Sequence, residues 1–135
     1  MEIRTRPKHA IDYQDIARPL AVMRRDYKKS ASSGWHSHRR GELLYSNSGY
    51  MTAQTEDGAF MLPSGYAVLL PPDVPHTVDI YGEVEMHAVF IEESVLREHW
   101  EPTRVLKVSP LLDASVQALA EEPVLYDENG RGQHL

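Results

Sequence analysis

Three histidines and one glutamate near the middle of the chain form the most constraining pattern in this sequence. His36, His38 and Glu42 follow the spacing H-x-H-x3-E, and His76 lies in a proline-bracketed segment farther along. Histidines two apart on a strand project from one face, because side chains alternate between the faces of a strand. Three imidazoles and one carboxylate suit a divalent first-row metal. The pattern predicts a metal site, with a metal-free polar pocket as the alternative.

Size and composition limit what the rest of the chain can be. Its 135 residues correspond to one domain that can bury a core without disulfides. The absence of cysteine excludes a disulfide framework and thiolate metal ligands. No apolar run reaches the length of a membrane span, and the chain does not open on a secretory leader. These features favour a cytoplasmic protein that does not contact a membrane.

The charge is divided unevenly along the chain. Residues 1–40 carry a net charge of +6, and residues 41–135 carry −12. Two solvated faces are the simpler interpretation of this division. The alternative is a basic arm that meets nucleic acid or the acidic part of a second copy. The sequence has no aromatic RNA-binding motif and no helix-turn-helix pattern.

Short apolar segments separated by glycine and proline indicate an all-β domain. We predict strands within 19–28 and at 35–38, 42–46, 50–55, 59–62, 66–70, 76–81, 84–91 and 104–108. Residues 47–49 and 56–58 have the composition of hairpin turns, and Gly82 marks a further turn. The run 66–70 is typical of a strand buried on both faces, and His87 is expected to be a core histidine. Closely spaced strands of this kind form antiparallel sandwiches or barrels.

A helix is expected after the last strand. Ser109 is a suitable N-cap, Pro110 suits the first helical position, and Pro123 should end the helix. An apolar stripe with helical spacing runs between them: Leu111, Leu112, Val116 and Leu119. We expect this stripe to supply more apolar surface than one small barrel covers, and the helix therefore to contribute to a homodimer.

The spacing of the two histidine regions resembles the two signature motifs of the cupin superfamily. Residues 36–49 match the first motif and residues 65–76 match the second. Ser30, Asp73 and Ile80 replace the usual glycine, glycine and asparagine, and none of these positions is a usual ligand. The resemblance implies a cupin-type antiparallel β-barrel, or jelly roll, followed by a C-terminal helix. It also implies the metal ligands His36, His38, Glu42 and His76.

A narrower resemblance covers most of the chain. The runs W-H-S-H-R-R-G-E-L-L-Y-S-N-S-G at 35–49 and A-V-L-L-P-P-D-V-P-H at 67–76 are similar to the N-terminal sensor cupin of AraC-type transcriptional regulators. Many such regulators carry glutamine where this chain has Glu42, so the carboxylate completes a metal tetrad here. The resemblance implies a sensor barrel at 1–108. Residues 109–135 would then form a helix and a truncated linker towards a helix-turn-helix domain outside this chain.

The sequence therefore predicts a ligand- or metal-sensing and dimerisation domain, and not an enzyme. The expected metal is zinc or nickel, with iron or manganese also open. The expected partners are a small-molecule or metal effector, a second copy, and DNA only through the absent C-terminal domain. The main alternative is a stand-alone metal-dependent cupin enzyme, such as a dioxygenase or isomerase. A barrel without a small-molecule role is the third.

Overall fold

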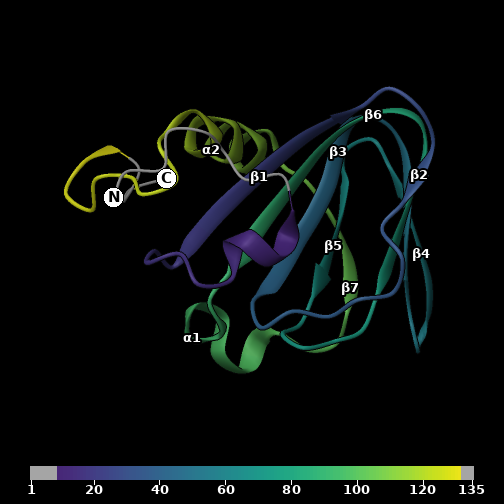
Figure 1. Cartoon of the computed structure of the whole chain (residues 1–135), viewed down its shortest axis with the longest axis horizontal. Helices are drawn as coiled ribbons and strands as arrows, with labels where there is room; N and C mark the ends of the chain where they lie inside the picture. The colour runs from purple at the N-terminus through teal and green to yellow at the C-terminus, as the bar shows by residue number, and fades with distance from the viewer. Residues whose placement is uncertain (1–8, 132–135) are drawn as a thin grey trace.

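A computed structural model describes residues 9–131 as a curled antiparallel sheet of seven strands with one long helix against it (Figure 1). The strands are β1 (Leu20–Tyr27), β2 (Ala31–Ser32), β3 (Gly41–Thr55), β4 (Gly58–Pro63), β5 (Tyr66–Leu70), β6 (Thr77–Ile91) and β7 (Arg104–Lys107). The helices are α1 (Glu93–Leu96) and α2 (Pro110–Glu121), with 3-10 turns η1 (Ala10–Tyr13) and η2 (Arg97–His99).

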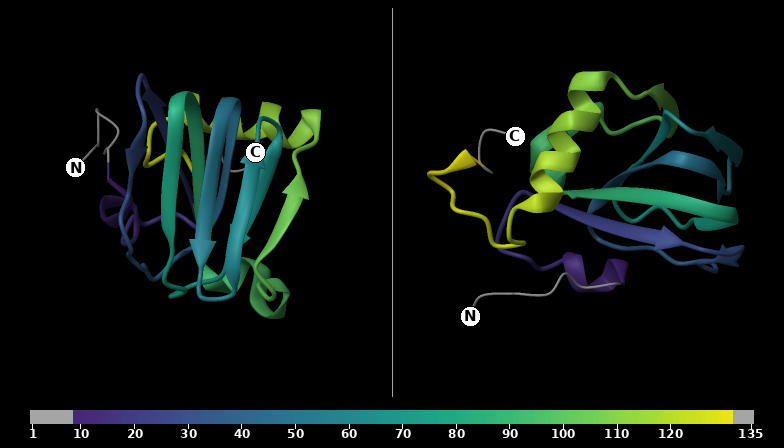
Figure 2. Two further views of the ribbon diagram at one scale, coloured as in Figure 1. Left: turned by 90° about the vertical axis from the view of Figure 1, so that its right-hand side faces the viewer. Right: turned by 90° about the horizontal axis from the view of Figure 1, so that it is seen from above.

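The two long strands β3 and β6 pair with each other and organise the barrel. The strand order is β1-β6-β3-β5-β7, while β2 adds to β6 and β4 adds to β3. The first half of β3 lies between β5 and β6, and its second half lies between β4 and β6. Each long strand therefore pairs with different neighbours along its two halves, and the sheet curls as Figure 2 shows. The fold confirms the predicted all-β class and its C-terminal helix.

Glycines that were expected to end strands instead let β3 and β6 continue. The β3–β6 register shifts on both sides of Ser48, where a hairpin was predicted. Gly49 has a φ of 90°, and an added Cβ would lie 2.2 Å from the carbonyl oxygen of Glu83. Gly82, with a φ of 77°, lies within β6. These two turn predictions were wrong, because a bulge and a hairpin both need residues that tolerate positive φ.

Other predicted elements are confirmed, with one further correction. β1 lies within 19–28, and β5 occupies 66–70. α2 begins after Ser109, whose hydroxyl accepts a 3.1 Å hydrogen bond from the Leu112 N–H. Residues 35–38 do not form a strand, since their pairing is limited to an isolated bridge between His36 and His76. Contact between the two histidine motifs therefore holds this segment in place, and the segment is not a strand of the sheet.

Both faces of the sheet are buried near the metal-motif end of β3. The barrel core lies on the inside, and its members from the long strands include Leu44, Met51, Val78, Ile80, Met86 and Phe90. The helix-side core lies between the sheet and α2, and includes Val22, Leu43, Tyr45, Val89, Val116 and Leu119. Alternation along β3 sends Leu44 into the barrel and Tyr45 toward α2. This double burial explains the continuous apolar runs in the sequence.

The uneven charge is partly neutralised inside the molecule. Four arginines from the first 40 residues form ion pairs with glutamates from the remainder: Arg18–Glu128, Arg24–Glu85, Arg39–Glu92 and Arg40–Glu92, at 3.0, 2.5, 2.6 and 3.1 Å. The basic segment thus meets acidic groups of its own chain, which neither sequence interpretation anticipated. Within residues 9–131, none of the helices has the length and apolar character needed to cross a bilayer.

Candidate metal centre

The two histidine regions meet through backbone hydrogen bonds. His36 and His76 exchange N–H···O bonds of 2.9 Å in each direction, just before β3 and β6 begin. The Asp73 N–H donates to the His38 carbonyl at 2.9 Å. Asp73 has a φ of 63°, a region that aspartate adopts more readily than most residues. Its conformation explains how aspartate replaces the usual motif glycine, and how the second motif supports the first.

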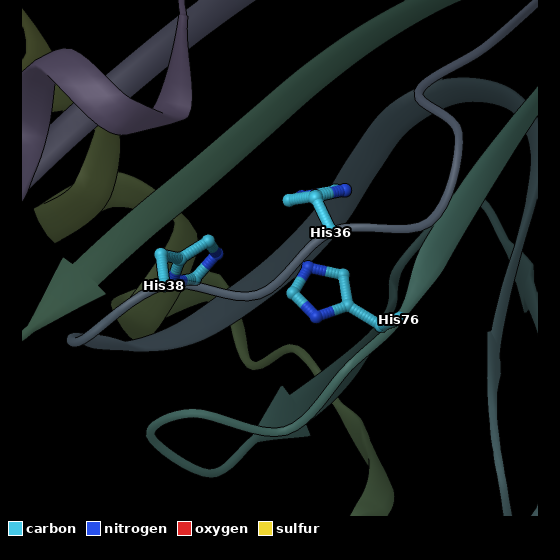
Figure 3. A group of neighbouring side chains, drawn as sticks. All are labelled: His36, His38 and His76. Atoms are coloured by element: carbon cyan, nitrogen blue, oxygen red, sulfur yellow. The ribbon is translucent and has the colours of Figure 1, made fainter.

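The side chains of His36, His38 and His76 converge on one point (Figure 3). One ring nitrogen from each histidine lies within 4.8 Å of the others. Glu42, the second residue of β3, places its Oε1 3.0 Å from His38 Nε2 and 3.5 Å from His76 Nε2. The structure therefore brings the four predicted residues together, and their role as metal ligands stays a prediction.

Backbone carbonyls fix the orientation of all three imidazole rings. His36 Nδ1 lies 2.9 Å from the Gly34 carbonyl, His38 Nδ1 2.7 Å from that of Arg40, and His76 Nδ1 2.8 Å from that of Val74. A carbonyl oxygen only accepts, so each Nδ1 carries the hydrogen. A neutral ring held in this way presents a lone pair on Nε2, whereas His38 Nε2 donates to Glu42 in this structure and must give up that hydrogen to bind a metal. Such outer hydrogen bonds commonly set the tautomer of metal-binding histidines.

The electrostatics of the site link His38 to Glu42. Burial by itself would raise the pKa of Glu42, but His38 and His76 together, through hydrogen bonding and charge, outweigh it and lower that pKa to about 2. Burial opposes charge on His38 as well, yet the hydrogen bond and charge of Glu42 raise its pKa above the usual value. Burial lowers the pKa of His36. The proton shared by His38 and Glu42 supplies a positive charge at the position where we expect a metal cation.

The donors present fit a divalent ion. His76 Nε2 is buried and makes no hydrogen bond with a described residue beyond its 3.5 Å approach to Glu42 Oε1, which is costly for a polar atom unless another partner binds it. Metal–nitrogen bonds of about 2.0–2.1 Å place ligands about 3–4 Å apart, so ring shifts of about 1 Å would bring the nitrogens onto one ion. His38, Glu42 and His76 are buried and His36 is half-buried. The site therefore opens on the His36 side.

A cavity of about 400 Å³ borders the open side of the cluster. His36 and Glu42 line it at the metal end, and its other walls come from β1, β2, β3, β6 and the segment around η1. His87 is buried on the opposite face of β6, where its ring stacks on Tyr45 at 5.1 Å between centroids. The expectation that His87 is a core histidine is confirmed by its burial, although it is not fully satisfied, since its Nδ1 makes no hydrogen bond with a described residue.

Sequence reasoning missed Arg40, which is fully buried behind the histidines. Its guanidinium donates to the carbonyls of Gln14, Ile16 and Arg18 at 3.0, 2.5 and 2.6 Å. Its backbone N–H donates to the Gln14 side chain at 2.8 Å, and its carbonyl accepts from His38. Arg40 thus ties the segment before β1 to the metal loop. A basic pair beside a turn gave no signal of this burial.

Residues 23–92 match the cupin domain family, and the chain belongs to that family. Among characterised proteins it is similar to the HTH-type transcriptional regulator NimR of Escherichia coli, with 34% identity over 87 residues. The match covers 63% of this chain and 31% of NimR. The chain therefore spans about a third of the length of this relative.

Solved structures support the fold. Apo ToxT of Vibrio cholerae, as a single-site variant, aligns with a TM-score of 0.63 and 11% identity over 87% of this chain and 51% of ToxT. A cupin superfamily protein of Desulfitobacterium hafniense aligns with a TM-score of 0.51 and 12% identity, over 55% of this chain and 68% of that protein. A further ToxT structure, which contains a bound unsaturated fatty acid, aligns with a TM-score of 0.55 and 12% identity, over 85% of this chain and 47% of ToxT.

Proposed function

We propose that this chain is the effector-sensing domain of an AraC-type transcriptional regulator and binds a divalent metal. His36, His38, Glu42 and His76 hold the ion, which supplies a fixed positive charge and an open coordination position beside the cavity. Residues 1–108 form the sensing barrel, and residues 109–135 connect it to a DNA-binding domain. The observation that carries the metal proposal is the convergence of three imidazoles whose Nδ1 atoms are all bound to backbone carbonyls.

The regulatory part of the proposal draws support from NimR and from the position of α2. NimR is a transcriptional regulator, and the similarity covers 63% of this chain. α2 packs its Val116 and Leu119 into the helix-side core, while Leu111 is 78% exposed. An exposed leucine beside a packed helix face can contact a second copy or an adjoining domain. A metal or small effector acts through such a helix only if it binds one helix arrangement better than another.

A metal-dependent cupin enzyme is the second candidate, and the cavity beside His36 favours it. A substrate in that cavity would reach the metal directly. The residues around the cavity give less support to acid–base chemistry. Glu42 is the single carboxylate among its described lining residues, and the proposal uses Glu42 as a ligand. Turnover of a small substrate by the metal-loaded chain would favour the enzyme over the sensor.

Calorimetric titration with zinc and with nickel tests the metal site. Wild-type protein should bind one ion, and His76→Ala should weaken binding by more than about 100-fold, because even outer-shell changes cost about 10–100-fold. Glu42→Gln keeps the size of the side chain and measures the contribution of the carboxylate. His99→Ala, at an exposed histidine outside the cluster, is the matched control. Equal affinities for wild type and His76→Ala would remove the proposed site.

A chimera tests the regulatory role separately. This chain would replace the matched region of NimR, with a reporter gene under a NimR-controlled promoter. We expect reporter output to respond to metal or effector in the wild-type chimera and to lose that response with His76→Ala. An unresponsive reporter, with the chimera folded and bound to its promoter, would contradict the sensing role without affecting the metal titration.

A further inference from the structure

The cavity next to the metal cluster has walls of distinctly different chemistry. Its barrel side is apolar and is formed by buried side chains: Met23, Leu44, Val78, Ile80 and Met86. Arg25 and Tyr27 line another part, and His36 and Glu42 line the metal end. A volume of about 400 Å³ lies within the range of small-molecule sites. An apolar chamber with a few polar groups in its wall suits a ligand with an apolar body and one polar head.

Arg25 differs from the arginines that hold the fold together. It is exposed and makes no ion pair or hydrogen bond with another described residue, and its guanidinium carbon lies 4.8 Å from the centroid of the Tyr27 ring. Its neighbour Arg24 instead pairs with Glu85 at 2.5 Å. Because side chains alternate along β1, Met23, Arg25 and Tyr27 share the cavity side, and Arg24 lies on the other. No carboxylate within residues 9–131 pairs with Arg25, so in this part of the chain its charge faces the cavity unpaired.

We infer that Arg25 recognises the anionic head of the effector, and that the effector is a small carboxylic acid with an apolar body. The inference rests on the proposed sensing function and names its ligand class. The guanidinium pairs with the carboxylate in a fork geometry, and contact with Tyr27 holds it in place. The body of the acid packs against Met23, Met86 and their aliphatic neighbours, where the thioethers adapt to its shape.

The charge of the lining selects a monoanion. Arg25 is the one arginine or lysine among the described residues around the cavity, and the other strong charges, Glu42 and the proposed ion, lie at the metal end. Away from that end, a phosphate with nearly two charges would face a single guanidinium. A neutral molecule would gain nothing from the charge of the exposed guanidinium, which water would continue to solvate. A carboxylate satisfies both conditions, and its apolar body replaces water along the inner wall. Arg25 binds the carboxylate, and the carboxylate does not need to coordinate the metal. This inference therefore differs from recognition of the head group by the metal itself.

A matched pair of probes tests the ligand class. We would titrate the full chain by calorimetry with 4-tert-butylbenzoate and with 4-tert-butylbenzamide, which differ little in shape and differ by one charge. Wild-type protein should bind the acid about tenfold more tightly than the amide. Arg25→Met keeps an unbranched side chain without charge, and should weaken the acid about tenfold while leaving the amide unchanged. Arg24→Met is the control on the opposite face and should leave both affinities unchanged.

Each arm has an outcome that overturns the inference. Equal affinity for acid and amide, no binding of the acid at millimolar concentration, or an unchanged acid affinity in Arg25→Met would each do so. The titrations are repeated after chelation, where the preference for the acid should persist. Its loss there would assign the carboxylate to the metal instead. Zinc titration of Arg25→Met shows whether this variant keeps its fold and its metal site. Zinc titration of the wild type shows whether the metal site exists at all, so a failure of the proposed metal site is distinguished from a failure of the inference about Arg25.

Discussion

The hydroxyl of Tyr45 donates a 2.9 Å hydrogen bond to the carboxylate of Asp113, and this bond joins strand β3 to helix α2. Tyr45 is fully buried and follows Glu42 by three residues on the same strand. Leu43 and Tyr45 point to the helix side, while Glu42 and Leu44 point into the barrel. The strand that carries the proposed fourth ligand therefore also anchors the helix proposed to transmit the signal.

Tyr45→Phe should destabilise the domain by about 0.5–1.5 kcal/mol, the usual net contribution of such a bond, or somewhat more because the acceptor is charged. The ring remains, so the loss measures the hydroxyl and its contact with Asp113. Urea unfolding gives the change, and a double-mutant cycle with Asp113→Ala isolates the pair. Tyr50→Phe on the same strand is the control, since no hydrogen bond of its hydroxyl is described. Equal losses at both tyrosines would contradict the assignment.

His87 should make the domain less stable as the pH falls below neutral. Burial lowers its pKa, and the charge of Arg24 adds to this effect against the opposing charges of Glu85, Asp113 and Asp26. Below about pH 6.5 the unfolded chain therefore binds a proton that the folded chain refuses. The stability supplied by neutral His87 is complete above that pH and declines as the pH falls toward the lowered value. The slope cannot exceed about 1.4 kcal/mol per pH unit for one proton.

The comparison that reveals this effect is between wild type and His87→Gln. Urea unfolding from pH 7.5 to pH 5 should show a stability difference that shrinks toward low pH, because glutamine does not titrate. The Asn47 amide donates to His87 Nε2 at 3.1 Å, and glutamine can retain a partner there. His99→Gln, at an exposed histidine, should run parallel to the wild type. A constant difference between wild type and His87→Gln would exclude His87 as the source.

Gly41 is needed for packing rather than for a special backbone conformation. A Cβ at this position would lie 2.1 Å from two ring atoms of Trp100, which is buried. Gly41→Ala should therefore destabilise the domain by about 1–3 kcal/mol or more, the usual range for overpacking a core. Thermal unfolding of Gly41→Ala, Trp100→Leu and the double variant provides the check. Because leucine is smaller than the indole ring, Gly41→Ala should cost less stability when Trp100 is also replaced by leucine. Strict additivity of the two stability losses would contradict the proposed clash.

The sequence located the four neighbouring residues of the candidate centre, although one of the reasons was wrong. His36 and His38 were expected to share the face of a strand, whereas a single bridge to His76 and the turn at Asp73 hold their segment. The prediction of proximity was confirmed because motif spacing constrains several local arrangements at once. Ordinary strands and α2 were predicted for a simpler reason, since apolar periodicity and Ser109 capping are local signals.

Features that depend on distant parts of the chain were not accessible in this way. The same glycine signal suits a hairpin or a bulge, and only the partner strand decides between them at Gly49. The route of the segment before β1 determines which carbonyls need a donor, so nothing near Arg40 indicates that a charged side chain is buried there. Arg24 and Arg25 are adjacent residues of the same type, so the sequence does not distinguish them. The register of β1 against β6 gives them different surroundings.

Arg40 provides the sharpest test of how the metal loop is held. Arg40→Met should destabilise the domain by about 3–5 kcal/mol, because the carbonyls of Ile16 and Arg18 would lose buried donors and Glu92 would lose a partner, while the Gln14 carbonyl would keep only its hydrogen bond from Arg39. Arg39→Met removes the adjacent, exposed arginine from the same glutamate and should cost less than about 1 kcal/mol. Arg40→Lys should not restore the wild type, since a single ammonium cannot reproduce donors spread over a planar guanidinium. Urea unfolding ranks the variants, and zinc titration of those that remain folded shows whether the His38 ring, which donates to the Arg40 carbonyl, has lost its orientation. Equal costs at positions 39 and 40 would mean that the buried hydrogen bonds of Arg40 contribute no more than a surface ion pair.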